Sequence, residues 1–282
     1  MLKLEEYVEQ AYLFRVIGER LPESLPLQEL LTQVREELLT TTKLPMAVDF
    51  LLSELRHLGV FGSAMVRLPH YFTSFQTYIV REAESDRGRF EIRVAFEILR
   101  HQAEFLTKKE ASPQGVFLYQ FETLCRNRLS YDYGLKAMSE DPIYDDHWRE
   151  WILTLRHQIG LVDLADMVYV RSQHYLNRKM PAGDSPLPPV KPTLFGEKEG
   201  KIALANRQKD PLYLFAALQR HLGYPRVPRP KRIDQSPQRI PQLMRRVEQL
   251  ETRIKLIEEE HRNGIDITQF YRGPLPSEPS DG

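Results

Sequence analysis

Residues 240–264, IPQLMRRVEQLETRIKLIEEEHRNG, carry the pattern that decides the architecture of this chain. Apolar side chains recur in this stretch with alternating gaps of four and three residues, which is the spacing of coiled-coil a and d positions. A stripe this narrow is typical of a helix that pairs with another helix, because a core helix has a broader apolar face. The sequence therefore predicts a coiled-coil helix over residues 241–264, with a seam of Leu243, Val247, Leu250, Ile254 and Ile257.

The charges beside this seam predict how two such helices would pair. With Val247 at an a position, Arg246 and Arg253 occupy g positions, and Glu251 and Glu258 occupy e positions. In a parallel pair of identical helices, each g side chain faces an e side chain of the partner. The arginines would then face the glutamates, so we expect a parallel homodimer. The alternative is that this short seam packs against the chain's own helices.

The composition indicates a globular protein with no strong overall charge. Of the 282 residues 41% are hydrophobic, and 39 Lys and Arg balance 39 Asp and Glu. The length suits one large or two ordinary domains, and a neutral chain has no overall field that attracts nucleic acid or membranes. One cysteine, Cys125, cannot form an internal disulfide, which favours a reducing compartment. We expect Cys125 to be a small buried apolar residue.

No segment of the sequence predicts export or membrane insertion. The N-terminus lacks the basic flank and the unbroken apolar core of a signal peptide. The longest apolar region, residues 151–170, is interrupted by Arg156, His157, Asp163 and Asp166. A membrane-spanning helix needs about 20 nearly uncharged residues. We therefore expect a cytoplasmic protein without a membrane span.

The rest of the chain also repeats apolar residues at three and four, and it shows no strand-like alternation of useful length. Pro26, Pro45, Ser112-Pro113 and a capping box from Thr73 to Gln76 mark helix starts. We expect an all-α fold, in which a multi-helix bundle of about seven helices is joined by proline-rich linkers to the C-terminal coiled-coil helix. The expected segments are the bundle (1–179), a proline-rich linker (180–209), a short helix (210–223), a basic proline-rich linker (224–240), the coiled-coil helix (241–264) and a disordered tail (265–282).

One region has the spacing of a known repeat. Residues 115–142 resemble a single tetratricopeptide unit, with Ala137 and Pro142 at matching positions. The stretch lacks the glycine of that motif, and no second copy follows in register. We therefore expect a helical bundle rather than an array of such repeats.

Common catalytic and nucleotide-binding motifs are absent from the sequence. It contains no GxxxxGK[ST], GxGxxG, HExxH, CxxC or GxSxG, and no cofactor is predicted. Acids and histidines in apolar helical surroundings are the main chemical candidates, because di-iron proteins project such residues into a bundle. The alternative is that the acids pair with arginines and fix the helix register. The candidate metal ligands are Glu54, His57, Glu97, His101, Asp163 and Asp166.

The basic linker provides a second chemical candidate. Residues 220–246 are rich in arginine and contain a single acid, Asp234. Flexible arginine-rich segments bind RNA or anionic surfaces by neutralising phosphates. The alternative is a solvated linker beside the coiled coil. The candidate anion-binding residues are Arg226, Arg229, Lys231 and Arg232.

These patterns favour a non-catalytic interaction or scaffold protein that self-associates through its C-terminal helix and binds a protein partner that the sequence does not identify. Two alternative functions stay open. The first is an RNA- or anionic-surface-binding adaptor that uses residues 220–246. The second is a metal-dependent, di-iron-like oxidase in the helical bundle.

Overall fold

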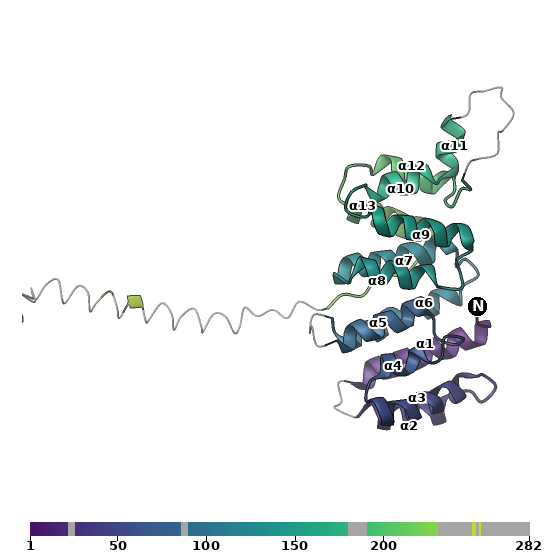
Figure 1. Cartoon of the computed structure of the whole chain (residues 1–282), viewed down its shortest axis with the longest axis vertical. Helices are drawn as coiled ribbons and strands as arrows, with labels where there is room; N and C mark the ends of the chain where they lie inside the picture. Colours follow the sequence, from purple (N-terminus) through teal and green to yellow (C-terminus); the bar gives the residue numbers. More distant parts are fainter. Residues whose placement is uncertain (22–25, 86–89, 180–190, 231–249, 252–253, 255–282) are drawn as a thin grey trace, which may run out of the picture. The chain divides into compact units, whose positions relative to one another are not determined.

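The computed structural model of the chain describes residues 1–21, 26–85, 90–179, 191–230, 250–251 and 254 (Figure 1). Within these residues the chain forms thirteen α-helices and no strand, so the expected all-α, multi-helix fold is confirmed. The helices are α1 (Leu4–Arg20), α2 (Leu27–Glu37), α3 (Leu44–Leu58), α4 (Phe61–Val66), α5 (Ser74–Glu84), α6 (Ile92–Leu106), α7 (Pro113–Asn127), α8 (Tyr131–Ser139), α9 (Asp146–Gln158), α10 (Leu164–Val170), α11 (Gln173–Lys179), α12 (Glu197–Ala205) and α13 (Pro211–Leu222).

The chain divides into two compact units, Met1–Pro230 and Lys231–Gly282. All thirteen helices belong to the first unit, which continues well past residue 179, where we expected the bundle to end. In the second unit Leu250, Glu251 and Ile254 are helical. The rest of the expected coiled-coil helix and the expected tail lie outside the described residues.

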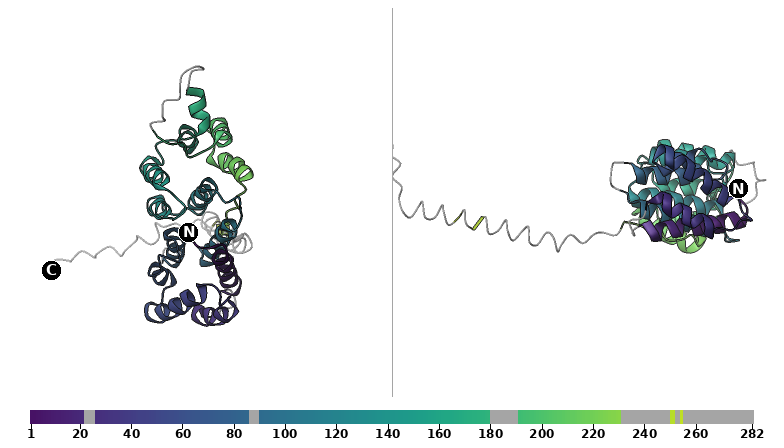
Figure 2. Two further views of the ribbon diagram at one scale, coloured as in Figure 1. Left: turned by 90° about the vertical axis from the view of Figure 1, so that its right-hand side faces the viewer. Right: turned by 90° about the horizontal axis from the view of Figure 1, so that it is seen from below.

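The helices of the first unit stack in two rows (Figure 2). One row consists of α2, α1, α6, α7 and α13, and the other of α3, α4, α5, α8 and α9, each helix contacting the next. Helix α1 therefore lies between α2 and α6. It is next to α2 in the sequence, but α6 follows it only after four other helices. At the far end of the stack, α12 contacts α10, α11 and α13.

Buried carboxylates on α1 hold the turn between α2 and α3. Glu6 accepts a hydrogen bond from the backbone N–H of Lys43 (2.9 Å), and Glu9 accepts one from the N–H of Leu39 (2.9 Å). The Tyr71 hydroxyl donates to the other oxygen of Glu6 (2.8 Å). These hydrogen bonds satisfy backbone N–H groups that have no helical partner, and they give the buried carboxylate oxygens of α1 the donors that burial requires.

Local sequence signals set several helix starts as expected. Thr73 and Gln76 form the capping box of α5. The Ser112 side chain caps α7, and Pro113 occupies its first turn. Pro45 lies in the first turn of α3, and α2 begins directly after Pro26. These starts are confirmed because each depends on neighbouring residues alone.

Part of the expected proline-rich linker is packed structure. Residues 180–190 lie outside the described residues, but residues 191–209 contain α12 and a buried Phe195. The Phe195 ring lies 5.3 Å, centre to centre, from the rings of both Trp148 and Trp151 on α9. The sequence of α12 gave little sign of a helix, because it has few large apolar residues and a central glycine, Gly200.

Residues 224–230, which we call the closing segment, also pack against the stack. Tyr224 and Val227 are buried. The Tyr224 hydroxyl lies 2.9 Å from a carboxylate oxygen of Glu122 on α7, and the Asn127 side chain donates to the carbonyl of Pro228 (3.2 Å). We had expected this stretch to be the start of a connector. The prolines keep the closing segment extended. Burial of Tyr224 and Val227, which alternate with its arginines, stabilises its packing on the stack. Residues 231–240 lie outside the described residues.

Candidate functional site

The six candidate metal ligands occupy three separate places. On α3, Glu54 forms an ion pair with Arg67, and His57 is exposed. On α6, Glu97 borders a small hollow of about 240 Å³ against α1. His101, one turn further on, lies 2.8 Å from the guanidinium of Arg100, and burial lowers the pKa of its imidazole, with the positive charge of Arg100 acting in the same direction.

The two acids near α10 have structural partners. Asp163 caps α10 by accepting from the N–H of Ala165 (3.1 Å), and its other oxygen accepts from the N–H of Gln208 (2.8 Å). Asp166 forms an ion pair with Arg207. The part of the chain that the structure describes contains no group of three or more His, Cys, Asp or Glu residues that could hold a metal ion. The six candidates therefore do not converge on one site, which the di-iron alternative requires.

Cys125 on α7 has the character of a packing residue. It is partly buried against the hydrophobic core, and burial raises the pKa of its thiol to about 11. A thiol with a raised pKa is protonated at neutral pH and is therefore a poor nucleophile.

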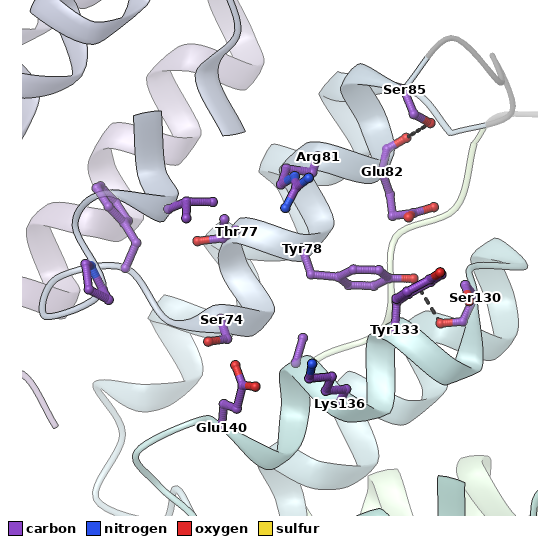
Figure 3. Close-up of a pocket in the computed structure, with 14 residues that line it drawn as sticks. Ser74, Thr77, Tyr78, Arg81, Glu82, Ser85, Ser130, Tyr133, Lys136 and Glu140 are labelled. Atoms are coloured by element: carbon purple, nitrogen blue, oxygen red, sulfur yellow. Dashed lines mark hydrogen bonds between the residues drawn. The ribbon is translucent and has the colours of Figure 1, made fainter. Parts of the chain in front are cut away.

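A hollow of about 690 Å³ lies between α5 and α8 (Figure 3). We call it the α5–α8 groove. Side chains from α5 and α8 face one another across it, and the end of α4 with the turn after it completes the lining. The lining residues are Val66, Pro69, Phe72, Ser74, Thr77, Tyr78, Arg81, Glu82, Ser85, Ser130, Tyr133, Lys136, Ala137 and Glu140.

Two contacts fix the walls of this groove. The Tyr78 hydroxyl of α5 donates to the carbonyl of Ser130 at the start of α8 (3.0 Å), and burial raises the pKa of Tyr78, so that it donates at neutral pH. On the other side of α5, the Glu84 carboxylate accepts from the N–H groups of Phe61 (2.6 Å) and Gly62 (2.7 Å) at the start of α4. A carboxylate at a helix N-terminus is favourable both for hydrogen bonding and for the helix dipole.

The groove carries charges of both signs. α5 contributes Arg81 and Glu82, and α8 contributes Lys136 and Glu140. Among the described residues none of these four forms an ion pair within 4.0 Å. Tyr133 leaves 66% of its surface exposed at the edge of the groove. The walls therefore offer free charged groups and an accessible aromatic ring to a ligand.

A second hollow, of about 500 Å³, continues the groove across α9. The two hollows share Lys136 and Glu140, and the second adds Arg149, Leu153 and Arg156. Arg149 pairs with the exposed Asp146 (3.1 Å), and Arg156 pairs with the exposed Asp132 (2.5 Å). The continuous surface thus crosses α5, α8 and α9, which are consecutive helices in one row of the stack.

The structure describes three of the residues proposed for self-association. Leu250 and Ile254 are helical and leave 53% and 54% of their surface exposed, and Glu251 between them is also exposed. The other members of the proposed seam lie outside the described residues, namely Leu243, Arg246, Val247, Arg253, Ile257 and Glu258.

Two of the four candidate anion-binding residues are described. Arg226 and Arg229 are exposed on the closing segment, while Lys231 and Arg232 lie outside the described residues. The arginines therefore stand on backbone that is held against α7 rather than on a free linker.

Sequence reasoning missed the α5–α8 groove. Its two walls come from helices separated by α6 and α7, and no motif or periodicity distinguishes their groove-facing residues from other polar surface residues. No helix among the described residues has the length and apolar character to cross a membrane. Comparison with known proteins adds no family, because no protein-family model, no curated protein and no solved structure matches this chain.

Proposed function

We propose that this protein is a non-catalytic helical scaffold whose stacked-helix unit is paired by a parallel coiled coil of its C-terminal helix. The observation that carries the proposal is the exposed pair Leu250 and Ile254, an adjacent d and a position in helical backbone. Two apolar side chains on one face of a helix, more than half exposed, are stabilised when a second helix covers them.

The charge pattern supports a parallel arrangement of identical helices. In that arrangement Arg246 faces Glu251 of the partner helix, and Arg253 faces its Glu258. In an antiparallel pair, g positions would face g positions, so that arginine would meet arginine and glutamate would meet glutamate. Like charges at these positions oppose pairing, so the charge pattern supports the parallel orientation over the antiparallel one.

Light scattering of the purified full chain tests self-association. The expected mass is twice the 33.1 kDa of the single chain. The double variant Leu250→Lys/Ile254→Lys should have the mass of one chain and an unchanged thermal unfolding of the helical stack. The matched control is Leu161→Lys, which alters an apolar residue of the first unit that is 85% exposed and should leave the mass doubled. A single-chain mass for the unaltered protein would refute the proposal.

Charge reversal tests the orientation. Glu251→Arg with Glu258→Arg would place arginines opposite arginines and should weaken the dimer. Adding Arg246→Glu with Arg253→Glu restores opposite charges in a parallel homodimer and should restore the doubled mass. If the fourfold variant stays as weak as the twofold one, the helices do not pair in the proposed register.

A second candidate function, binding of RNA or another anionic polymer, is supported by the exposed Arg226 and Arg229 on the closing segment. Binding of fluorescein-labelled poly(U) should weaken steeply between about 50 and 200 mM salt, because each phosphate contact releases counterions. Replacing the four basic residues 226, 229, 231 and 232 with glutamine should abolish it. Binding that is insensitive to salt or to these replacements would dismiss this candidate.

A further inference from the structure

We propose that the α5–α8 groove and its continuation over α9 bind an acidic peptide segment of a partner protein that also carries an apolar anchor residue. The inference deepens the proposed scaffold function, because it assigns the surface and the chemistry through which the scaffold recognises its partner. It does not depend on how the C-terminal helix pairs.

The size and continuity of the surface favour a peptide. The groove measures about 690 Å³, within the range of roughly 300–1,000 Å³ that ligand sites occupy. The second hollow adds about 500 Å³ and shares Lys136 and Glu140 with the first. A surface that runs over three helices and is open along its length can follow an extended or helical segment. A small molecule would fill only part of it.

The charges of the combined surface favour an acidic occupant. Its lining has four cations, Arg81, Lys136, Arg149 and Arg156, against two carboxylates, Glu82 and Glu140. Guanidinium groups bind carboxylates through paired, charge-assisted hydrogen bonds.

The four cations differ in how readily a new carboxylate reaches them. Arg81 and Lys136 stand on opposite walls and form no ion pair within the described part of the chain. Arg149 and Arg156 have partners, but Asp146 and Asp132 are exposed, with side chains 95% and 57% accessible. Exposed pairs contribute at most about 1 kcal/mol, so an incoming carboxylate can compete with them.

An apolar anchor has a place beside these cations. Val66 and Tyr133 in the groove leave 47% and 66% of their surface exposed, and Leu153 in the second hollow leaves 38% exposed. Exposed tyrosine is typical of interaction surfaces, because it offers a large apolar area and a hydroxyl at low cost in conformational entropy. The Tyr78–Ser130 hydrogen bond keeps α5 and α8 in place, so that the surface is formed before a partner arrives.

Selection from a phage-displayed library of random dodecapeptides on the full chain tests the proposal. The enriched peptides should contain Asp or Glu beside an aromatic or aliphatic residue. Fluorescence anisotropy with the most enriched synthetic peptide should show binding that Arg81→Glu/Lys136→Glu weakens by roughly tenfold or more, since one lost charge-assisted bond is worth that much. Tyr133→Ala, which alters an exposed residue and should leave the fold intact, should also weaken it.

The control is Arg15→Glu/Arg93→Glu, which makes the same charge change on exposed arginines of α1 and α6 and should leave peptide binding unchanged. The proposal is overturned if no acidic peptides are enriched, or if the α5 and α8 variants bind the peptide as the unaltered protein does. It is also overturned if poly(U) binds the full chain and is the ligand lost in Arg81→Glu/Lys136→Glu. The single-chain variant Leu250→Lys/Ile254→Lys should still bind the peptide, so failure of the groove and failure of self-association are distinguishable.

Discussion

Replacing Tyr224 with phenylalanine should destabilise the helical stack measurably, although it removes a single oxygen atom. The Tyr224 hydroxyl lies 2.9 Å from a carboxylate oxygen of Glu122 and 3.1 Å from the carbonyl oxygen of Phe215. Burial and the neighbouring carboxylate raise the pKa of this phenol, so it is protonated and donates at neutral pH. The hydroxyl has one proton, which it donates to Glu122 on α7 at the shorter distance, with the Phe215 carbonyl of α13 as a second acceptor beside it.

The magnitude follows from the charge and burial of the acceptor. Glu122 is nearly inaccessible to solvent, and among the described residues the ion pair with Arg126 is the side-chain partner that its carboxylate keeps after the replacement. A hydrogen bond to a charged group contributes about 1.5–3 kcal/mol to the free energy of unfolding. For a unit of this size, 1 kcal/mol corresponds to about 2–4 °C, so Tm should fall by about 3–12 °C.

Thermal unfolding followed by circular dichroism provides the measurement, and Tyr213→Phe provides the matched control. Tyr213 lies on α13, close in sequence to Tyr224, and is 65% exposed. It makes no side-chain hydrogen bond among the described residues. Its replacement should change the free energy of unfolding by no more than about 0.5 kcal/mol. Equal melting temperatures for the two variants would refute the view that the closing segment is bonded into the stack.

Two further replacements test other contacts. Gly200→Ala should destabilise the stack by about 1–3 kcal/mol in urea unfolding, because its Cβ would clash with the side chains of Ser172 and His174. The control Gly18→Ala meets ordinary packing and should be neutral or stabilising. Burial raises the pKa of Asp141 above its usual 3.8, despite a hydrogen bond from Gln120. The contribution of Asp141 to the free energy of unfolding is therefore fully present below pH 3.8 and is lost as pH rises through the folded-state pKa. In the Asp141→Asn variant, the urea concentration at the unfolding midpoint should therefore depend less on pH above 3.8. Parallel pH profiles for the two proteins would contradict this assignment.

The parts of the fold that the sequence predicts are those set by near neighbours. The capping box of Thr73 and Gln76 spans three residues, and an all-α fold follows from the apolar spacing of each segment. The position of α1 beside α6 could not be predicted in this way, because it depends on contacts between distant residues. Glu6 and Glu9 illustrate the difficulty. In the sequence they look like surface acids, and only the fold places the backbone N–H groups of Lys43 and Leu39 beside them.

The candidate site was less predictable than the fold. Asp163 and Asp166 lie in an apolar stretch and resemble functional acids, yet their partners Gln208 and Arg207 lie in a region that was expected to be linker. The groove cations Arg81 and Lys136 look like ordinary solvent-exposed charges in the sequence. What distinguishes them is the approach of α5 to α8, which no local pattern encodes.

The insertion of α1 between α2 and α6 has a consequence for biosynthesis. A ribosome delivers α1 before α6, and α6, which covers one flank of α1, is complete only at Leu106. Protein synthesis adds about 5–20 residues per second. The buried α1 residues Leu13, Phe14 and Ile17 are therefore exposed for several seconds before α6 is available to cover them. Nascent chains of this protein should therefore be clients of ribosome-associated chaperones during that interval, and slow codons placed before α6 should increase aggregation.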